Sequence, residues 1–268
     1  MLPRQELRLW QRFPLRGLGG ITFRDVSFTY PGAGNEPVLT NINLVIPEGK
    51  VTAIVGSSGS GKTTLLKLLL KIYDPSSGDI RVGRTSLSTI SHRLWRGQCG
   101  TVLQDGLLFS DTIANNVAVA DERPNVPRLL RAVDVANIEP FIDSLPLRYN
   151  TRIGAEGNGV SQGQKQRLLL ARAVYKEPTY LFLDEATNAL DANNERVVMQ
   201  NLNQFFEENG GNPRTVVVVA HRLSTVRQAD QIVVLEHGEI AEIGTHDELT
   251  RQRGRYYELV RNQLELGV

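Results

Sequence analysis

Alternating and uninterrupted apolar runs divide the first part of this chain into strands. From Ile21 to Tyr30, Ile, Phe and Val alternate with polar residues until Pro31-Gly32 predicts a turn. The alternation returns from Val38 to Ile46. A tight turn then leads into Val51 to Val55, an uninterrupted apolar run that is typical of a strand buried on both faces.

The rest of the chain has a different pattern. Between about Gln104 and Ser161 strands are scarce, and apolar residues recur at helical spacing from Val126 to Ala136, which predicts a helical insert. Short apolar runs separated by helical patterns follow, namely Tyr180 to Leu183, Val216 to Ala220 and Ile232 to Leu235. This alternation of predicted strands and helices predicts an α/β fold, with a mostly parallel sheet, covering helices and a helical subdomain.

Composition and charge narrow the class of protein. The 268 residues are 41% hydrophobic and 22% charged, as in ordinary globular proteins. A net charge of only +1 gives no sign of a nucleic-acid binder, and no run approaches the roughly 18 apolar residues of a membrane span. The single cysteine, Cys99, excludes an intramolecular disulfide, favours a reducing compartment and is expected in the core.

A glycine-rich motif lies between the strand at Val51 to Val55 and a leucine-rich helix. Residues Gly56 to Thr63 match G-x-x-x-x-G-K-[ST] in full, so backbone N–H groups, the helix N-terminus near Gly61 and the Lys62 cation are expected to hold phosphates. A surface turn that fits by chance is the alternative, which the strand and helix context disfavours. The predicted nucleotide contacts are Gly56, Ser57, Ser58, Gly59, Ser60, Gly61, Lys62, Thr63 and Thr64.

Two adjacent carboxylates end a later predicted strand. Asp184 and Glu185 follow Tyr180 to Leu183 and should emerge at the carboxyl edge of the sheet, where α/β proteins assemble their sites. We predict that Asp184 and the Thr63 hydroxyl serve Mg²⁺, while Glu185 acts on the attacking water. Paired acids after a strand can also merely cap the next helix, but the phosphate loop upstream favours a functional role.

Val160 to Gln164 lies about twenty residues before Asp184. This segment resembles the LSGGQ signature of the ATP-binding cassette family, although Gln162 and Val160 replace the usual glycine and leucine, and the resemblance runs from about Gly20 to Leu264. Further motifs occur in the family's order, namely Tyr30 as A-loop, Gln104 as Q-loop, Asn188 to Asp191 as D-loop and Ala220-His221-Arg222 as H-loop. The resemblance implies a P-loop NTPase fold with a mostly parallel core sheet, an antiparallel β subdomain and an inserted α-helical subdomain at about residues 105–175.

The resemblance also implies ATP and Mg²⁺ as cofactors and assigns roles to residues. Tyr30 would stack on adenine, and His221, which taken alone is more often structural, would reach the γ-phosphate. The metal set would be Thr63, Gln104 and Asp184. The catalytic set would be Glu185 as general base with His221, Gln104 and Lys62.

A second motif lies just before the predicted helix that ends near Tyr175. Ser161 and Gln164 form an S-x-x-Q capping box, whose simplest interpretation is a good N-cap, but Gly163 beside exposed N–H groups also suits an anion. The resemblance implies that Ser161, Gly163 and Gln164 cover the phosphate held by a second copy, giving a head-to-tail homodimer around two Mg-ATP. Asp191 is expected at that interface, or else as a helix N-cap.

The resemblance to exporters is carried by the stretch from Leu107 to Val117, similar to LF-x-x-T-I-x-x-N-I. It implies a transmembrane domain as partner, with residues 1–20 as a linker from it and 21–268 as the ATPase domain at the cytoplasmic face of the cell (inner) membrane. The S-Q-G-Q sequence from Ser161 to Gln164 resembles that of peptide or bacteriocin exporters. Thr151 to Gly157 resembles T-x-V-G-E-x-G, except that Ala155 replaces the usual glutamate and Glu156 could substitute.

Two other functions remain open. A soluble cassette acting on ribosomes or DNA would need a second cassette, a coiled coil or a basic face, none of which the sequence shows, so no nucleic-acid partner is expected. A regulatory nucleotide-binding module without turnover disagrees with the presence of Glu185.

Overall fold

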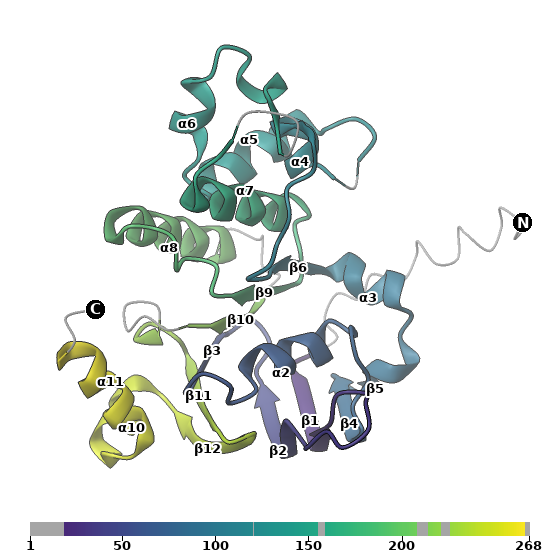
Figure 1. Cartoon of the computed structure of the whole chain (residues 1–268), viewed down its shortest axis with the longest axis vertical. Coiled ribbons are helices and arrows are strands. Elements are labelled where there is room, and N and C mark those ends of the chain that lie inside the picture. Colours follow the sequence, from purple (N-terminus) through teal and green to yellow (C-terminus); the bar gives the residue numbers. More distant parts are fainter. Residues whose placement is uncertain (1–18, 120, 155–158, 208–213, 221–225, 266–268) are drawn as a thin grey trace, which may run out of the picture.

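A six-stranded sheet forms the centre of the molecule (Figure 1). The computed structural model describes residues 19–119, 121–154, 159–207, 214–220 and 226–265. The strand order is β12-β11-β3-β10-β9-β6, and every neighbouring pair is parallel except β11 with β12. Its strands are β3 (Val51–Val55), β6 (Cys99–Val102), β9 (Tyr180–Asp184), β10 (Thr215–Val219), β11 (Gln231–Glu236) and β12 (Glu239–Gly244).

The parallel strands separate two hydrophobic cores. In β10, Val217 and Val219 face the core that contains helix α2 (Lys62–Leu69), whereas Val216 and Val218 face the core that contains the later helices. A strand with apolar residues on both faces reads as a continuous apolar run, which is why β3, β9 and β10 could be located from the sequence. Cys99 at the start of β6 is buried in the α2 core, as expected.

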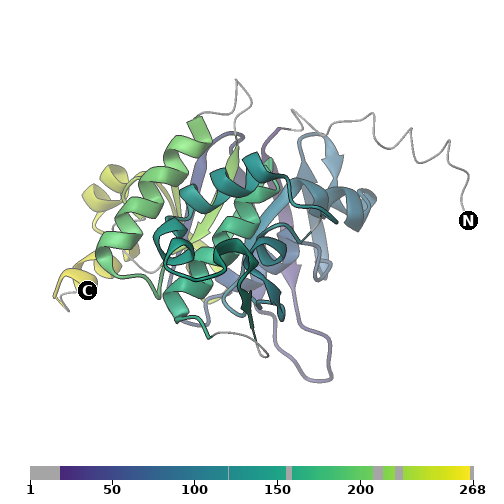
Figure 2. The ribbon, with the colours of Figure 1, turned by 90° about the horizontal axis from the view of Figure 1, so that it is seen from above.

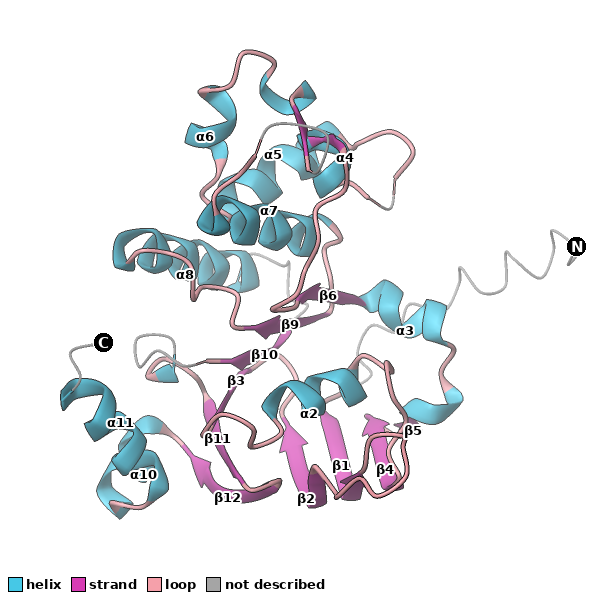
Figure 3. Cartoon of the chain, viewed as in Figure 1, coloured by secondary structure: helices cyan, strands magenta, loops and turns pink. Residues whose placement is uncertain are grey.

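An antiparallel sheet covers the other side of α2 (Figure 3). Its order is β2-β1-β4-β5, from β1 (Ile21–Phe28), β2 (Leu39–Ile46), β4 (Ser77–Val82) and β5 (Thr85–Ser86). Between this sheet and the parallel one, helix α3 (His92–Gln98) carries Trp95, whose Nε1 donates to the Leu69 carbonyl. The carbonyl of the last α2 residue is thereby satisfied by a side chain from another element.

The helices of the middle of the chain form a separate layer above the parallel sheet (Figure 1, Figure 2). This region comprises α4 (Ile113–Val117), α5 (Val126–Val135), α6 (Glu139–Asp143) and α7 (Gln162–Tyr175), with the short antiparallel pair β7 (Asp111–Thr112) and β8 (Arg152–Ile153). Helix α8 (Ala192–Glu207) packs beside them in the same core. The helix predicted from Val126 to Ala136 is confirmed by α5.

Two further helices, α10 (His246–Gln252) and α11 (Arg255–Glu265), follow β12, and 3₁₀ turns lie at Leu87–Thr89 and Arg148–Asn150. Within the described ranges, no helix combines the length and apolar character that a membrane span requires.

Candidate nucleotide site

The phosphate loop bends tightly between β3 and α2. Gly56 follows the last residue of β3 with a φ of 151°, and a Cβ atom there would lie 2.1 Å from the Leu235 carbonyl oxygen. Only glycine fits this position without moving β11. Gly61 (φ 100°) is the N-cap of α2 and supplies no side chain, so the free N–H groups of the first turn stay available to an anion.

Lys62, the first residue of α2, folds back over this loop. Its Nζ donates to the carbonyl oxygens of Gly56 (2.9 Å) and Ser57 (2.7 Å). Burial lowers the pKa of the ammonium, and the nearby carboxylates of Glu185 and Asp184 partly oppose that effect. Two neutral carbonyls are weaker partners for this cation than phosphate oxygens would be.

Asp184 ends β9 directly beside the start of α2. The Thr63 hydroxyl donates to Asp184 Oδ1 at 3.3 Å, and the aspartate is only 1% exposed. Its second oxygen, Oδ2, is buried without a hydrogen-bond partner, as is the hydroxyl of Ser60. Burial raises the pKa of Asp184, while the Thr63 hydrogen bond lowers it. An unpartnered buried carboxylate oxygen next to a hydroxyl fits a hard divalent cation such as Mg²⁺.

The described ranges contain no cluster of three or more His, Cys, Asp or Glu side chains that could hold a metal ion. That finding does not argue against Mg²⁺, because this ion keeps several waters and takes only one or two protein carboxylates beside substrate phosphates.

Glu185 lies next to Asp184 in an uncommon backbone conformation. Its φ is 53°, in the left-handed region, where a non-glycine residue stores on the order of 1–3 kcal/mol of strain. The backbone N–H donates to the Val219 carbonyl (3.1 Å), and carboxylate Oε2 accepts from Asn188 Nδ2 (2.7 Å). Such strain gathers at functional sites, which agrees with the role predicted for this carboxylate.

Tyr30 and Gln104 are predicted site residues that lie outside the phosphate loop and the end of β9. The Tyr30 hydroxyl is 3.0 Å from Thr64 Oγ1, and its ring packs edge-to-face on Tyr73 with Lys67 Nζ 5.7 Å from the ring centroid. Gln104 follows β6 at the same sheet edge as Asp184, but its side chain is exposed. It makes no hydrogen bond to Thr63 or Asp184, so the protein alone does not complete the predicted metal set.

Ser161 forms the predicted capping box at the start of α7. Its hydroxyl accepts from the Gln164 N–H (3.2 Å), and its own N–H donates to Gln164 Oε1 (2.8 Å). A Cβ atom on Gly163 would lie 3.0 Å from the Ala189 carbonyl oxygen, so glycine allows α7 to approach the segment after Glu185. The structure therefore confirms the cap and the helix through Tyr175, but places these residues on a different element from the phosphate loop of the same chain.

The remaining predictions concern Asp191, His221 and the segment at Ala155 and Glu156. Asp191 caps α8, because its Oδ1 accepts from the N–H groups of Asn193 (3.1 Å) and Asn194 (3.0 Å), and these bonds lower its pKa. His221, the predicted γ-phosphate contact, lies outside the described residues, as do Ala155 and Glu156.

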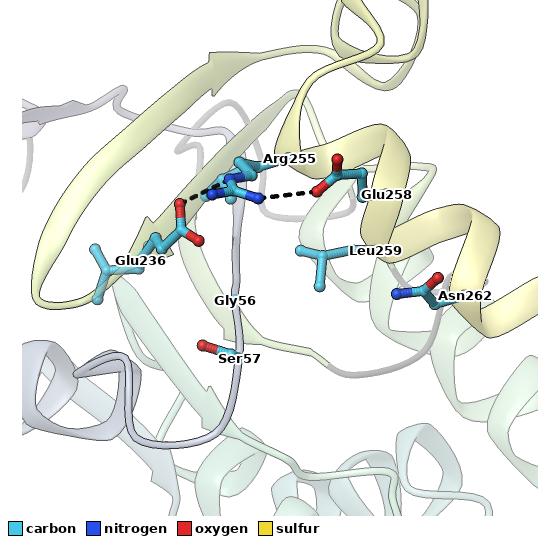
Figure 4. Close-up of a pocket in the computed structure, with 9 residues that line it drawn as sticks. Gly56, Ser57, Glu236, Arg255, Glu258, Leu259 and Asn262 are labelled. Atoms are coloured by element: carbon cyan, nitrogen blue, oxygen red, sulfur yellow. Dashed lines mark hydrogen bonds and ion pairs between the residues drawn. The ribbon is translucent and has the colours of Figure 1, made fainter.

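No pattern in the sequence predicted that α11 would approach the phosphate loop. A cavity of about 110 Å³ lies between Gly56, Ser57 and the α11 residues Leu259 and Asn262 (Figure 4). Arg255 joins α11 to the end of β11, because its Nε lies 3.0 Å from Glu236 Oε2, while its Nη1 lies 3.1 Å from Glu258 Oε2 on α11 itself. The contact depends on distant chain segments, and no local motif marks it.

Comparisons with known proteins agree with this geometry. A family model described as "ABC transporter" matches residues 39–188, more than half of the chain. The chain is 44% identical over 245 residues to ABC transporter B family member 13 of Arabidopsis thaliana and 45% identical over 244 residues to ATP-binding cassette sub-family B member 5 of Mus musculus. These alignments cover 91% and 90% of this chain but only 19% of each relative.

A solved structure, described as a bacterial Atm1-family ABC exporter with ATP bound, superimposes with a TM-score of 0.85 at 35% identity. It covers 91% of this chain, which spans 42% of that protein.

Proposed function

This chain belongs to the ABC transporter family, and on that premise we propose that it binds and hydrolyses ATP to drive export across a membrane. The observation that carries the proposal is the pairing at one sheet edge of the phosphate loop, Lys62 and Thr63, with the buried carboxylate of Asp184. Two further findings support the same assignment: the exporter neighbour is described with ATP bound, and the relatives are named as an ABC transporter and an ATP-binding cassette protein.

In the proposed site, the loop amides and Lys62 hold the β- and γ-phosphates. Lys62 exchanges its two carbonyl partners for phosphate oxygens, and Tyr30 stacks on adenine once its hydroxyl has left Thr64 Oγ1. Glu185 orients the attacking water and accepts its proton, with His221 near the γ-phosphate. Phosphoryl transfer depends chiefly on such positioning and on charge stabilisation.

Thr63 and Asp184 would hold Mg²⁺ directly or through water, and Gln104 would join them from β6. The ion would neutralise charge on the phosphate oxygens. The orphaned Oδ2 of Asp184 supports this assignment, because a buried carboxylate oxygen without a donor is costly unless a cation fills its place.

A second copy of the chain would complete each site. Ser161, Gly163 and Gln164 lie on α7, apart from the phosphate loop of their own chain, and Ser161 is exposed. A head-to-tail dimer would bring this helix N-terminus against the phosphate held by the other copy, where its partial positive charge would stabilise the anion.

We also propose a docking surface for a transmembrane domain in the helical layer. Phe109 (54% exposed) and Val119 (50% exposed) line a groove of about 370 Å³ together with Asp111, Asp121 and Glu122, and Leu107, two residues before Phe109, is 71% exposed. Exposed apolar residues of this size gathered in one place mark an interaction site. The relatives are several times longer than this chain, and they include a named transporter and an exporter structure, which supports a membrane domain as the occupant. With that occupant, the cytoplasmic membrane face is the proposed location. A peptide or bacteriocin cargo stays a prediction.

The proposal is tested by equilibrium ATP binding and phosphate release with the native chain. We expect saturable ATP binding, and phosphate release that requires Mg²⁺ and stops in EDTA. An absence of ATP binding would contradict the proposal, whereas ATP binding without any phosphate release would favour a regulatory module.

A further inference from the structure

One side chain outside the predicted motifs joins the start of α7 to the backbone of Glu185. Gln166 Nε2 donates to the Glu185 carbonyl oxygen at 3.1 Å, and Gln166 Oε1 accepts from the Ala189 N–H at 2.9 Å. One partner is an acceptor and the other a donor, so both ends of the amide are assigned by their partners.

The first of these bonds is accepted by a residue with an uncommon backbone conformation. Because Glu185 has a φ of 53°, its carbonyl accepts from both the Asn188 N–H (3.2 Å) and Gln166 Nε2. Left-handed conformations of bulky residues persist only where the surroundings hold them in place. The Gln166 amide is therefore one of the contacts that stabilise this turn, and with it the direction in which the Glu185 carboxylate leaves the backbone.

The surroundings of Gln166 indicate that this bridge is rigid. The glutamine is half-buried, and Gly163, one turn earlier on α7, allows the helix to lie against the Ala189 carbonyl. Asn188, between the two backbone groups that Gln166 holds, donates to the Glu185 carboxylate itself. Gln166 thus fixes both ends of the short turn whose side chains hold the carboxylate.

We propose that Gln166 is a positioning residue for Glu185: by holding the backbone of the Glu185–Ala189 turn from α7, it aims the carboxylate at the attacking water. This inference rests on the proposed ATPase function. Gln166 makes no hydrogen bond to the phosphate loop or to Asp184 in the described structure, so its effect should fall on turnover and not on nucleotide affinity.

Gln166→Glu is the sharpest test, because it keeps an acceptor for the Ala189 N–H but replaces the donor to Glu185 with an oxygen that repels that carbonyl. We expect kcat for ATP to fall roughly 10- to 100-fold, as for small displacements of a catalytic group, with the Kd for ATP unchanged. Gln166→Met, which loses both bonds, should show the same split between kcat and Kd.

The matched control is Gln98→Glu at the opposite end of β9. Gln98 Oε1 accepts from the Thr179 hydroxyl (3.0 Å), a bond that a carboxylate can also accept, so native kcat is expected. Native kcat in Gln166→Glu, or a Kd that rises by the factor by which kcat falls, would overturn the inference. If the native chain binds ATP without releasing phosphate, the proposed function fails and the inference falls with it; native turnover together with an unimpaired Gln166→Glu contradicts the inference alone.

Discussion

The phosphate loop and the start of α7 both offer backbone N–H groups at a helix N-terminus, but they differ in the side chains that surround those groups. At the loop, Lys62 is buried, and Asp184 beside it keeps an unpartnered oxygen. At α7, Ser161 is exposed, and its capping box already satisfies the N–H groups of Ser161 and Gln164. The difference suggests that nucleotide affinity comes from the loop, whereas α7 contributes only when a second copy presents it.

The largest effect should come from the carboxylate next to the loop. Glu185→Gln removes the base and should lower kcat about 10²- to 10⁴-fold while ATP binding persists. The control is Glu177→Gln, because Glu177 is also a left-handed glutamate (φ 49°) but lies at the far end of α7. Phosphate-release kinetics check the result, and equal rates in the two variants would contradict the role of Glu185.

The two ends of α2 permit a second comparison. Lys62→Met should weaken ATP binding about 10- to 100-fold, because charge-assisted bonds to phosphate contribute roughly 1.5–3 kcal/mol. Lys71 is also buried and donates to carbonyls of Leu87 (2.8 Å) and Ile90 (2.6 Å), but it lies beyond the other end of the helix. Lys71→Met should therefore reduce stability and leave the Kd for ATP unchanged, as titration calorimetry and thermal unfolding can show.

A third variant separates capping from turnover. Ser161→Ala should cost about 1 kcal/mol of stability through the lost cap and should also lower kcat, without changing ATP affinity of the monomer. Thr245 forms an equivalent capping box with Glu248 on α10, away from the site, so Thr245→Ala should cost similar stability and keep kcat. Equal kcat in both variants would reduce Ser161 to a structural cap.

The smallest effect concerns the stability of the metal-free protein. Burial raises the pKa of Asp184 above its unfolded value, so the stability linked to its protonation is present at acidic pH below about 4 and is lost as pH rises through the folded pKa. At neutral pH the buried carboxylate is thus unfavourable, and Asp184→Asn should raise Tm by roughly 2 °C without metal. The same variant should lose the extra Tm increase that Mg²⁺ gives with ATP; a lower Tm without metal would contradict this explanation.

Features that depend on local chemistry were predictable from the sequence. The phosphate loop and the Ser161 capping box each need only a few consecutive residues, and the apolar strands β3 and β10 are buried on both faces. β4 was not located, because its sequence Ser77–Val82 is largely polar and its pairing with β1 is set by tertiary contacts.

Parts of the candidate site depended on long-range contacts in the same way. Gln166 reaches residues 19 and 23 positions away, and α11 reaches Gly56, and neither arrangement leaves a local motif. Asp191 showed the opposite difficulty, since one residue suited both an N-cap and an interface; the structure shows the cap. The roles of Tyr30, Gln104 and His221 stay predictions.

The composite site is tested most directly by measuring Mg-ATP hydrolysis as a function of the concentration of the chain, with Glu185→Gln beside it. If two copies complete each site, the rate rises faster than linearly with concentration and is abolished in the variant. A rate that stays proportional to concentration from the lowest range upward, with the variant unimpaired, would contradict both the shared site and the role of Glu185.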